Sequence, residues 1–228
     1  MATSLTLGAS GADVNPLLVE STAPHGAPQF TQITNEHYKP AFEQAVREAR
    51  ADIAAIVGNA QAPTFANTIE ALEFSGRRLD RISNILFNLN EAHTNDTMQA
   101  LALELSPMLT EFSNDVSLDP KLFARVKAVY DRRESLGLNA EQRRLLEKTY
   151  KGFARSGGAL SDGDKKIYRE LTARLSELSL QFNQNSLAAT NAFTLHVTDP
   201  AVVGELPDFV REGMAAEAKE RGLDGWVV

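Results

Sequence analysis

PTFANTIEALEFSGRRLDRISNILFNLNEAHTN, residues 63–95, is the stretch that decides the fold. Apolar residues recur along it in steps of three and four when Gly76 is counted as a position of the series: Phe65, Ile69, Leu72, Leu79, Ile82, Leu86 and Leu89. Such a stripe is typical of an amphipathic helix whose apolar face other helices must cover. We therefore expect one long helix from Pro63 to Asn95 inside a helical bundle.

Two local features refine this expectation. The helix begins either at Pro63-Thr64 or at Asn67, where Glu70 would complete a variant of the capping box. Gly76 lies on the apolar stripe without a side chain. We expect a neighbouring backbone to approach it so closely that an alanine would clash.

The opposite face of this helix is polar and carries Asn84, Asn88 and Glu91, and Asn90 and His93 form a polar cluster with the first two. Asparagine is a poor helix former, so its amides must find compensation. Either they form hydrogen bonds between helices, or they line a groove in which an extended peptide meets donors and acceptors. The sequence leaves both open, and Asn84, Asn88 and His93 are the candidate site residues.

The helical period recurs before and after this stretch. Pro40 suits the first turn of a helix that Gly58 ends, and Pro107 should kink its helix near Glu104. Six helices joined by short loops make a bundle. Beside residues 63–95, they are expected at 40–57, from 95 past Phe112, from 120 to before Gly137, from 139 to before Gly157 and from 161 to about 190.

The period changes to two after residue 192, where Phe193, Leu195 and Val197 alternate with polar residues and predict a strand. A seventh helix is expected from Pro207 to Arg221, and Gly225 to Val228 read as the start of a second strand. A lone hairpin is marginal in water, so we expect the sheet to be completed beyond Val228. The alternative is a frayed apolar tail.

The predicted fold class is thus mainly α, a bundle of about seven helices with a short C-terminal strand pair. We divide the chain into an extended or partly disordered arm (1–33), a helical bundle (34–191) and the strand-helix-strand start of a further segment (192–228). The sequence contains no cysteine, which removes disulfides and thiol catalysis.

Composition and charge limit the classes of partner that this chain is expected to bind. A net charge of -7, with lysine and arginine scattered among acidic residues, argues against nucleic acid as a partner. No run approaches the roughly 18 apolar residues that cross a bilayer, so no membrane partner is expected. Residues 1–8 do not form a secretory signal. We expect a cytoplasmic protein, with the periplasm left open.

The sequence contains few of the residue patterns that form catalytic or metal sites in enzymes. The four histidines are His25, His37, His93 and His196, and no two stand at the i, i+4 spacing of a zinc-binding His-Glu-x-x-His helix. Gly157-Gly158 is better read as a helix stop than as a phosphate loop. From these residues alone we predict no catalytic residue and no metal ligand in the chain.

Several blocks of the sequence nevertheless resemble, in order, the N-terminal half of bacterial peptidyl-dipeptidases. These are zinc metallopeptidases of the family of oligopeptidase A, thimet oligopeptidase and neurolysin. The blocks are Asn15–Leu18, His37–Glu43, Pro63–Glu73 with Ser75-Gly76, Leu118–Tyr130, Glu141–Lys151, Leu175–Leu180, Leu195–Pro200 and Gly225-Trp226.

This resemblance implies an almost wholly helical, clam-like enzyme with a deep channel, neurolysin-like in its N-terminal part, that cuts short peptides. The peptidyl-dipeptidase branch releases dipeptides from the C-terminus. The family's His-Glu-x-x-His helix and further Glu ligand lie downstream of the region matched here. No catalytic or zinc-binding residue is therefore carried over to any position of this sequence.

The expected function is that of the N-terminal, channel-wall domain of such a peptidase. Zinc and short peptides would be bound by the full-length parent, and the partner of this domain would be the C-terminal catalytic region of the same chain. The domain alone should bind no zinc and be inactive. The alternative is a free-standing, non-catalytic helical module that binds peptides or serves as a scaffold. An open reading frame encoding His-Glu-x-x-His beyond Val228 would distinguish the two.

Overall fold

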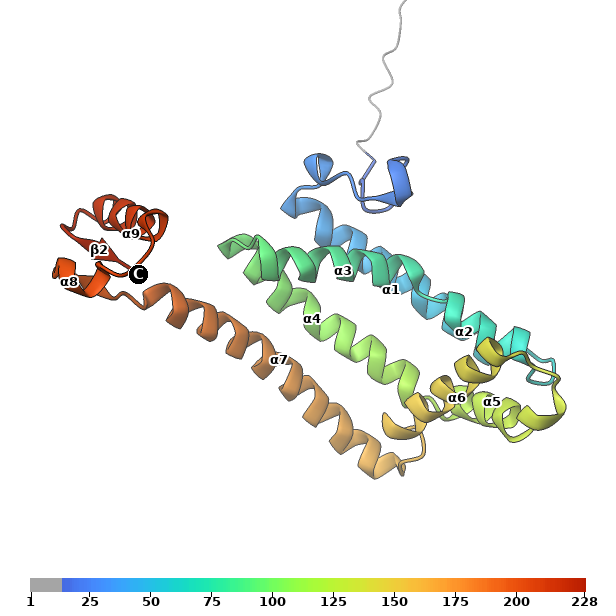
Figure 1. Ribbon diagram of the computed structural model, residues 1–228. Helices are drawn as coiled ribbons and strands as arrows, with labels where there is room; N and C mark the ends of the chain where they lie inside the picture. Colours follow the sequence, from blue (N-terminus) through green and yellow to red (C-terminus); the bar gives the residue numbers. More distant parts are fainter. Residues whose placement is uncertain (1–13) are drawn as a thin grey trace, which may run out of the picture. The chain divides into compact units, whose positions relative to one another are not determined.

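The computed structural model describes residues 14–228, which form two compact units divided between Leu180 and Gln181. The first unit is helical, as predicted (Figure 1). Its α-helices are α1 (Asn35–Val57), α2 (Ala71–Phe74), α3 (Arg77–Ala92), α4 (Asp96–Ser117), α5 (Pro120–Asp131), α6 (Ala140–Arg155) and the first part of α7 (Asp162–Ala192). One π-helical turn, η3 (Phe65–Glu70), and three short 3-10 helices complete it: η1 (Pro24–Gly26), η2 (Phe30–Gln32) and η4 (Arg133–Ser135).

The stretch 63–95 is not one helix, and the prediction is wrong on this point. It begins with η3, continues as α2 and breaks at Ser75-Gly76 before α3 starts. Thr64 begins η3, because its side chain accepts from the Asn67 amide while the Asn67 side chain accepts from the Thr64 amide. Of the two predicted starts, the one at Pro63-Thr64 is therefore the one found.

Gly76 makes the break and is needed for a different reason from the one predicted. Its backbone is left-handed, with φ 67° and ψ 9°, a conformation that glycine adopts without steric cost. A Cβ at Gly76 would lie 3.5 Å from the Cβ of Ala49, which is ordinary contact. The expected clash is therefore wrong, and the constraint is the backbone angle.

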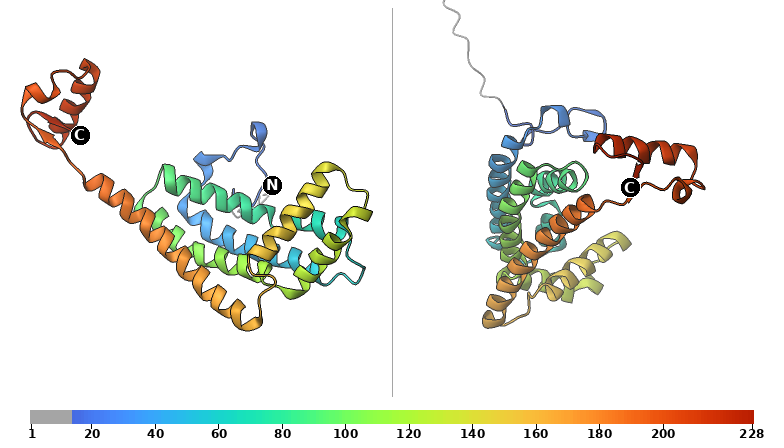
Figure 2. Two further views of the ribbon diagram at one scale, coloured as in Figure 1. Left: turned by 60° about the horizontal axis from the view of Figure 1, so that its bottom comes forward. Right: turned by 90° about the vertical axis from the view of Figure 1, so that its left-hand side faces the viewer.

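The break lets one apolar stripe serve two hydrophobic clusters. Leu79, Ile82 and Leu86 of α3 pack with residues of α1 and α4, among them the fully buried Phe42 and Leu105. Ile69 of η3 packs instead with Val126, Val129 and Leu146 of α5 and α6. Ile69, Leu79, Ile82 and Leu86 of the predicted stripe are buried, and its other three residues are partly buried against the same two clusters. Figure 2 shows the helices of this unit from two further sides.

The first helix begins five residues before the predicted start. Thr34 caps α1, since its side chain and that of His37 pair with each other's backbone amides. Pro40 therefore lies inside α1 and not in its first turn. The described part of the predicted arm, residues 14–33, is tied to α1: Leu17 is buried in the first cluster, and the Asn15 side chain donates to the His37 carbonyl. Residues 1–13 of that arm lie outside the described residues.

The other predicted helix starts are confirmed. Asn95, Asp119 and Asn139 each accept hydrogen bonds from backbone amides in the first turn of the following helix. Ser161 and Asp164 form the predicted pair at the start of α7. Pro107 lies within α4, which continues through it to Ser117. Short polar side chains thus position the bundle helices, as expected of N-caps.

The second unit holds the end of α7, β1 (His196–Val197), α8 (Pro200–Val203), α9 (Asp208–Glu220) and β2 (Trp226–Val227). The two strands pair antiparallel, and hydrogen bonds between Leu195 and Val228 extend the ladder. Gly225 turns the chain into β2 with φ 87°, where a Cβ would lie 2.5 Å from the Val197 carbonyl oxygen. The predicted strand pair and the helix between its two strands are confirmed, although β1 is shorter than 193–198.

Candidate functional site

The candidate residues Asn84, Asn88 and His93 are exposed at α3 and its C-terminal end. The Asn88 side chain donates to the Asn84 carbonyl at 2.7 Å, a bond within its own helix. His93 is the C-cap of α3, and its amide donates to the Leu89 carbonyl. Within the described residues these side chains form no hydrogen bond to another helix, and they make up a solvent-facing polar surface.

No cluster that could hold a metal ion exists within residues 14–228: no three histidine, cysteine, aspartate or glutamate side chains converge there. His37 is used in the cap of α1, and the His196 ring lies 2.6 Å from the Asp224 carbonyl oxygen. These two histidines thus have local structural roles. None of the helices in residues 14–228 combines the length and apolar character needed to span a membrane.

A cavity of about 600 Å³ lies at the break between α2 and α3. Residues of α2, of α3 and of the break between them line it, together with residues of α1, α4 and α6. The apolar part of its wall consists of Ile53, Leu72, Leu79, Leu109, Phe112, Val116 and Phe153. The candidates Asn84, Asn88 and His93 are not among its lining residues.

Hydrogen bonds beside this cavity hold the break in place. The Gly76 amide donates to an Asp52 carboxylate oxygen at 3.1 Å. Arg78 donates to both carboxylate oxygens of Glu48, at 2.7 and 2.6 Å. Asp80 has no such partner among the described residues, and partial burial raises the pKa of its carboxyl group. The cavity is thus mainly apolar, and two carboxyl groups without a hydrogen-bond or ion-pair partner among the described residues, those of Glu73 and Asp80, line it.

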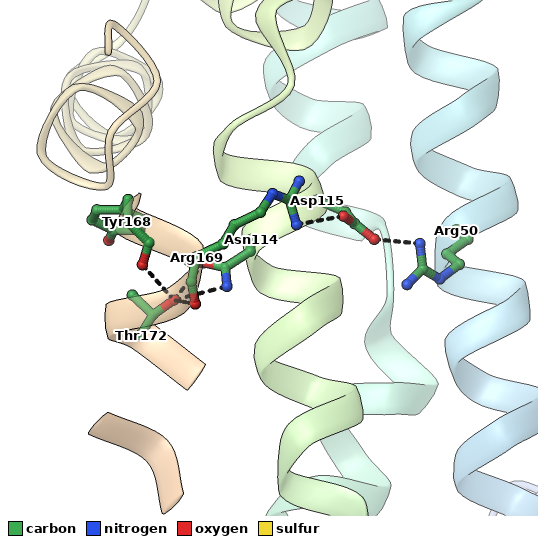
Figure 3. Close-up of polar contacts among 6 residues, drawn as sticks. All are labelled: Arg50, Asn114, Asp115, Tyr168, Arg169 and Thr172. Atoms are coloured by element: carbon green, nitrogen blue, oxygen red, sulfur yellow. Dashed lines mark hydrogen bonds and ion pairs between the residues drawn. The ribbon is translucent and has the colours of Figure 1, made fainter. Parts of the chain in front are cut away.

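A second polar feature joins three helices. Asp115 of α4 lies between two arginines, 2.5 Å from Arg50 of α1 and 2.8 Å from Arg169 of α7 (Figure 3). Next to it, the side chain of the buried Asn114 donates to the Thr172 hydroxyl at 2.8 Å, and that hydroxyl lies 3.0 Å from the Tyr168 carbonyl oxygen. This network positions α7 and has the character of a structural contact.

Sequence reasoning missed the cavity and this network. The Ser-Gly pair at residues 75–76 is the sequence feature that could have indicated the cavity. The helical spacing does not reveal it, because the glycine is counted as one position of a continuous apolar stripe. The signal for the network was the polar series Ser106, Thr110, Ser113, Asn114 and Ser117 along α4. These positions recur at helical spacing and indicate a polar contact face.

Comparison with known proteins gives close relatives, although no family model matches the chain. Dipeptidyl carboxypeptidase of Escherichia coli (strain K12) is 44% identical over 216 residues, which are 94% of this chain and 32% of that protein. Dipeptidyl carboxypeptidase of Salmonella typhimurium is 41% identical over 92% of the chain and 31% of its own length.

Relatives of lower identity include an oligopeptidase A. Oligopeptidase A of Escherichia coli is 28% identical over 94% of this chain and 31% of its own length. The resemblance predicted from the sequence blocks is therefore confirmed. The chain spans about a third of the length of the curated relatives that it matches.

Proposed function

We propose that this chain, a relative of the dipeptidyl carboxypeptidases and oligopeptidases A, forms a helical wall of the peptide channel of such a peptidase. The observation that carries the proposal is the 44% identity to a dipeptidyl carboxypeptidase over 94% of the chain. Because the chain corresponds to only 32% of that relative, the wall would act together with a larger part of a longer polypeptide. Residues 192–228 would begin a segment that continues into that part.

The substrates of the whole enzyme would be short peptides, from which it releases C-terminal dipeptides. Zinc would supply the chemistry by polarising the scissile carbonyl group and by lowering the pKa of a bound water. The sequence has no His-Glu-x-x-His motif, so the zinc ligands would come from the other part of the polypeptide. No hydrolytic step is assigned to this chain, and the chain alone should be inactive.

The wall would bind the peptide substrate and keep folded proteins out of the channel. Asn84, Asn88 and His93 would face the channel, where their side chains meet the backbone of an extended peptide. Two properties support this assignment: the three side chains are exposed, and neither the Asn84 amide group nor the His93 ring has a hydrogen-bond partner within the described residues. Folded proteins would be kept out because the helices narrow the entrance.

Two experiments test the proposal. The first reads the gene beyond codon 228, where a continuous frame encoding His-Glu-x-x-His is expected and a stop codon would favour a free-standing module. The second uses a chimaera in which this chain replaces the matched 216-residue segment of the Escherichia coli relative. We expect the chimaera to release C-terminal dipeptides from short peptides, and the 228-residue chain to release none. Peptide cleavage by the chain alone, with stoichiometric zinc after dialysis, would contradict the proposal.

A further inference from the structure

The long helix α7 presents large apolar side chains to solvent. Ile167, Leu171, Leu175 and Leu178 are between 44 and 65% exposed. At about 100° per residue, these four lie within an arc of about 80° on one side of the helix. We call them the α7 stripe. Phe182, which is 72% exposed, continues the same spacing. Scattered apolar residues are normal on a surface, but a contiguous row of this kind marks an interaction site.

The opposite side of α7 holds the helix in place. Arg169, Thr172 and Ser176, which contact α4, lie about 100 to 160° around the helix from the centre of the α7 stripe. Their partners include Ser106 and Asn114, which are only 9% and 6% exposed. Turning the α7 stripe inward would leave these buried polar groups unpaired, at a cost of about 1–3 kcal/mol for each. The outward orientation of the α7 stripe is therefore built into the contact.

We propose that the α7 stripe is the docking surface for the part of the peptidase polypeptide that has no counterpart in these 228 residues. This inference rests on the proposed function. The occupant is inferred from the lengths of the two proteins. The match covers 94% of this chain but 32% of the relative, so about two thirds of the relative lies outside the match. A helix that is anchored by polar bonds on one side and apolar on the other suits a position between two parts of one protein.

Cysteine labelling tests the proposal, because the chain has no cysteine of its own. The variants are Leu171→Cys and Leu175→Cys on the stripe, with Glu134→Cys as a control on the exposed η4 segment. Each is made in the 228-residue chain and in the chimaera, and maleimide labelling is followed by mass spectrometry of the peptide that carries the site. Dipeptide release by each chimaera is measured alongside.

In the 228-residue chain, all three cysteines should react at similar rates. In the chimaera, the two stripe cysteines should react at least tenfold more slowly, and the control cysteine at its former rate. Equal labelling in the chain and the chimaera would overturn the proposal. Concentration-dependent protection in the 228-residue chain, with a dimer in solution, would overturn it in favour of a second copy.

The two measurements separate this inference from the function on which it rests. A chimaera that releases dipeptides but leaves the stripe cysteines reactive contradicts the docking surface alone. Protected stripe cysteines without dipeptide release contradict the proposed function alone. An inactive chimaera with reactive stripe cysteines contradicts both.

Discussion

The hydroxyl oxygen of Ser176 on α7 lies 2.8 Å from that of Ser106 on α4. The Thr110 hydroxyl donates to the same Ser176 oxygen at 3.0 Å. The last long helix of the first unit thus meets its neighbour through small polar side chains, whereas α1, α3 and α4 meet through apolar ones. Because the polar side of α7 contacts α4, the apolar side of α7 is the one left exposed.

Replacing Asp115 by alanine should lower the free energy of unfolding of the 228-residue chain by about 1 kcal/mol. The change removes ion pairs to Arg50 and Arg169 together, and the two partly exposed pairs are each worth up to about 1 kcal/mol. Urea unfolding followed by circular dichroism measures the loss. Asp131→Ala is the matched control, because it removes only the i, i+4 pair with Lys127. An equal effect of both variants would contradict a joining role for Asp115.

Two glycines in the first unit should respond to alanine in opposite directions. Gly76→Ala forces a side chain into a left-handed backbone and should destabilise the chain by about 1–2 kcal/mol. Gly152 lies within α6, where a Cβ would meet nothing within 4 Å. Gly152→Ala should therefore stabilise the chain by about 0.5–1 kcal/mol. Thermal unfolding compares the two variants, and a Gly76→Ala chain as stable as the parent would show that the break does not need its glycine.

The pH dependence of stability should reveal the burial of Asp80. Since burial raises the pKa of this carboxyl group, ionisation of Asp80 costs stability above the folded pKa. That cost disappears as the pH falls below the unfolded value of about 3.9. Asp80→Asn should therefore be more stable than the parent at pH 7, by an amount that shrinks toward pH 4. Urea unfolding at a series of pH values measures the difference.

Glu36 supplies a control of opposite sign. Hydrogen bonding to the Thr34 side chain, and then to its own backbone, lowers the pKa of Glu36. Its ionised form stabilises the folded chain above the unfolded pKa of about 4.3, and this stability is lost as the pH falls through the folded pKa. Glu36→Gln should therefore be less stable than the parent at pH 7. If both variants shift stability in the same direction, the assignment for Asp80 is wrong.

In the active chimaera, replacing Asn84 and Asn88 together by alanine should raise KM roughly threefold to tenfold and leave kcat nearly unchanged. The two amides would contact bound peptide in both the ground state and the transition state, and a hydrogen bond is worth about 1 kcal/mol. Steady-state kinetics with a short peptide measures both constants. Gln61→Ala removes an exposed amide in the segment between α1 and η3 and should alter neither constant. An unchanged KM in the double variant would remove these residues from the channel.

Much of the first unit could be predicted from its caps and its period. Asn95, Asp119, Asn139 and Ser161 each begin the helix expected of them, because a short polar side chain acts locally on the next turn. The start of α1 was placed too late, since His37 replaces the usual Glu or Gln of a capping box. The break at Gly76 was missed because the apolar stripe keeps its register on both sides.

The candidate site could be predicted only in part. Helical spacing indicated a polar face on residues 77–92, but not whether that face meets another helix. For α7, the period indicated an amphipathic helix and could not say which side would be covered. The answer depends on Ser106 and Asn114 of α4, which lie 70 and 58 residues from their partners on α7 and require polar contacts. The local sequence pattern does not indicate which residues pair over such separations.

The most direct measurement of the central claim is the rate at which the chimaera releases C-terminal dipeptides from a short peptide, compared with that of the 228-residue chain. If this chain forms a wall of the peptidase channel, the chimaera releases dipeptides and the chain alone does not. A correctly folded chimaera without dipeptide release, or a chain that cleaves peptides by itself, would contradict the claim.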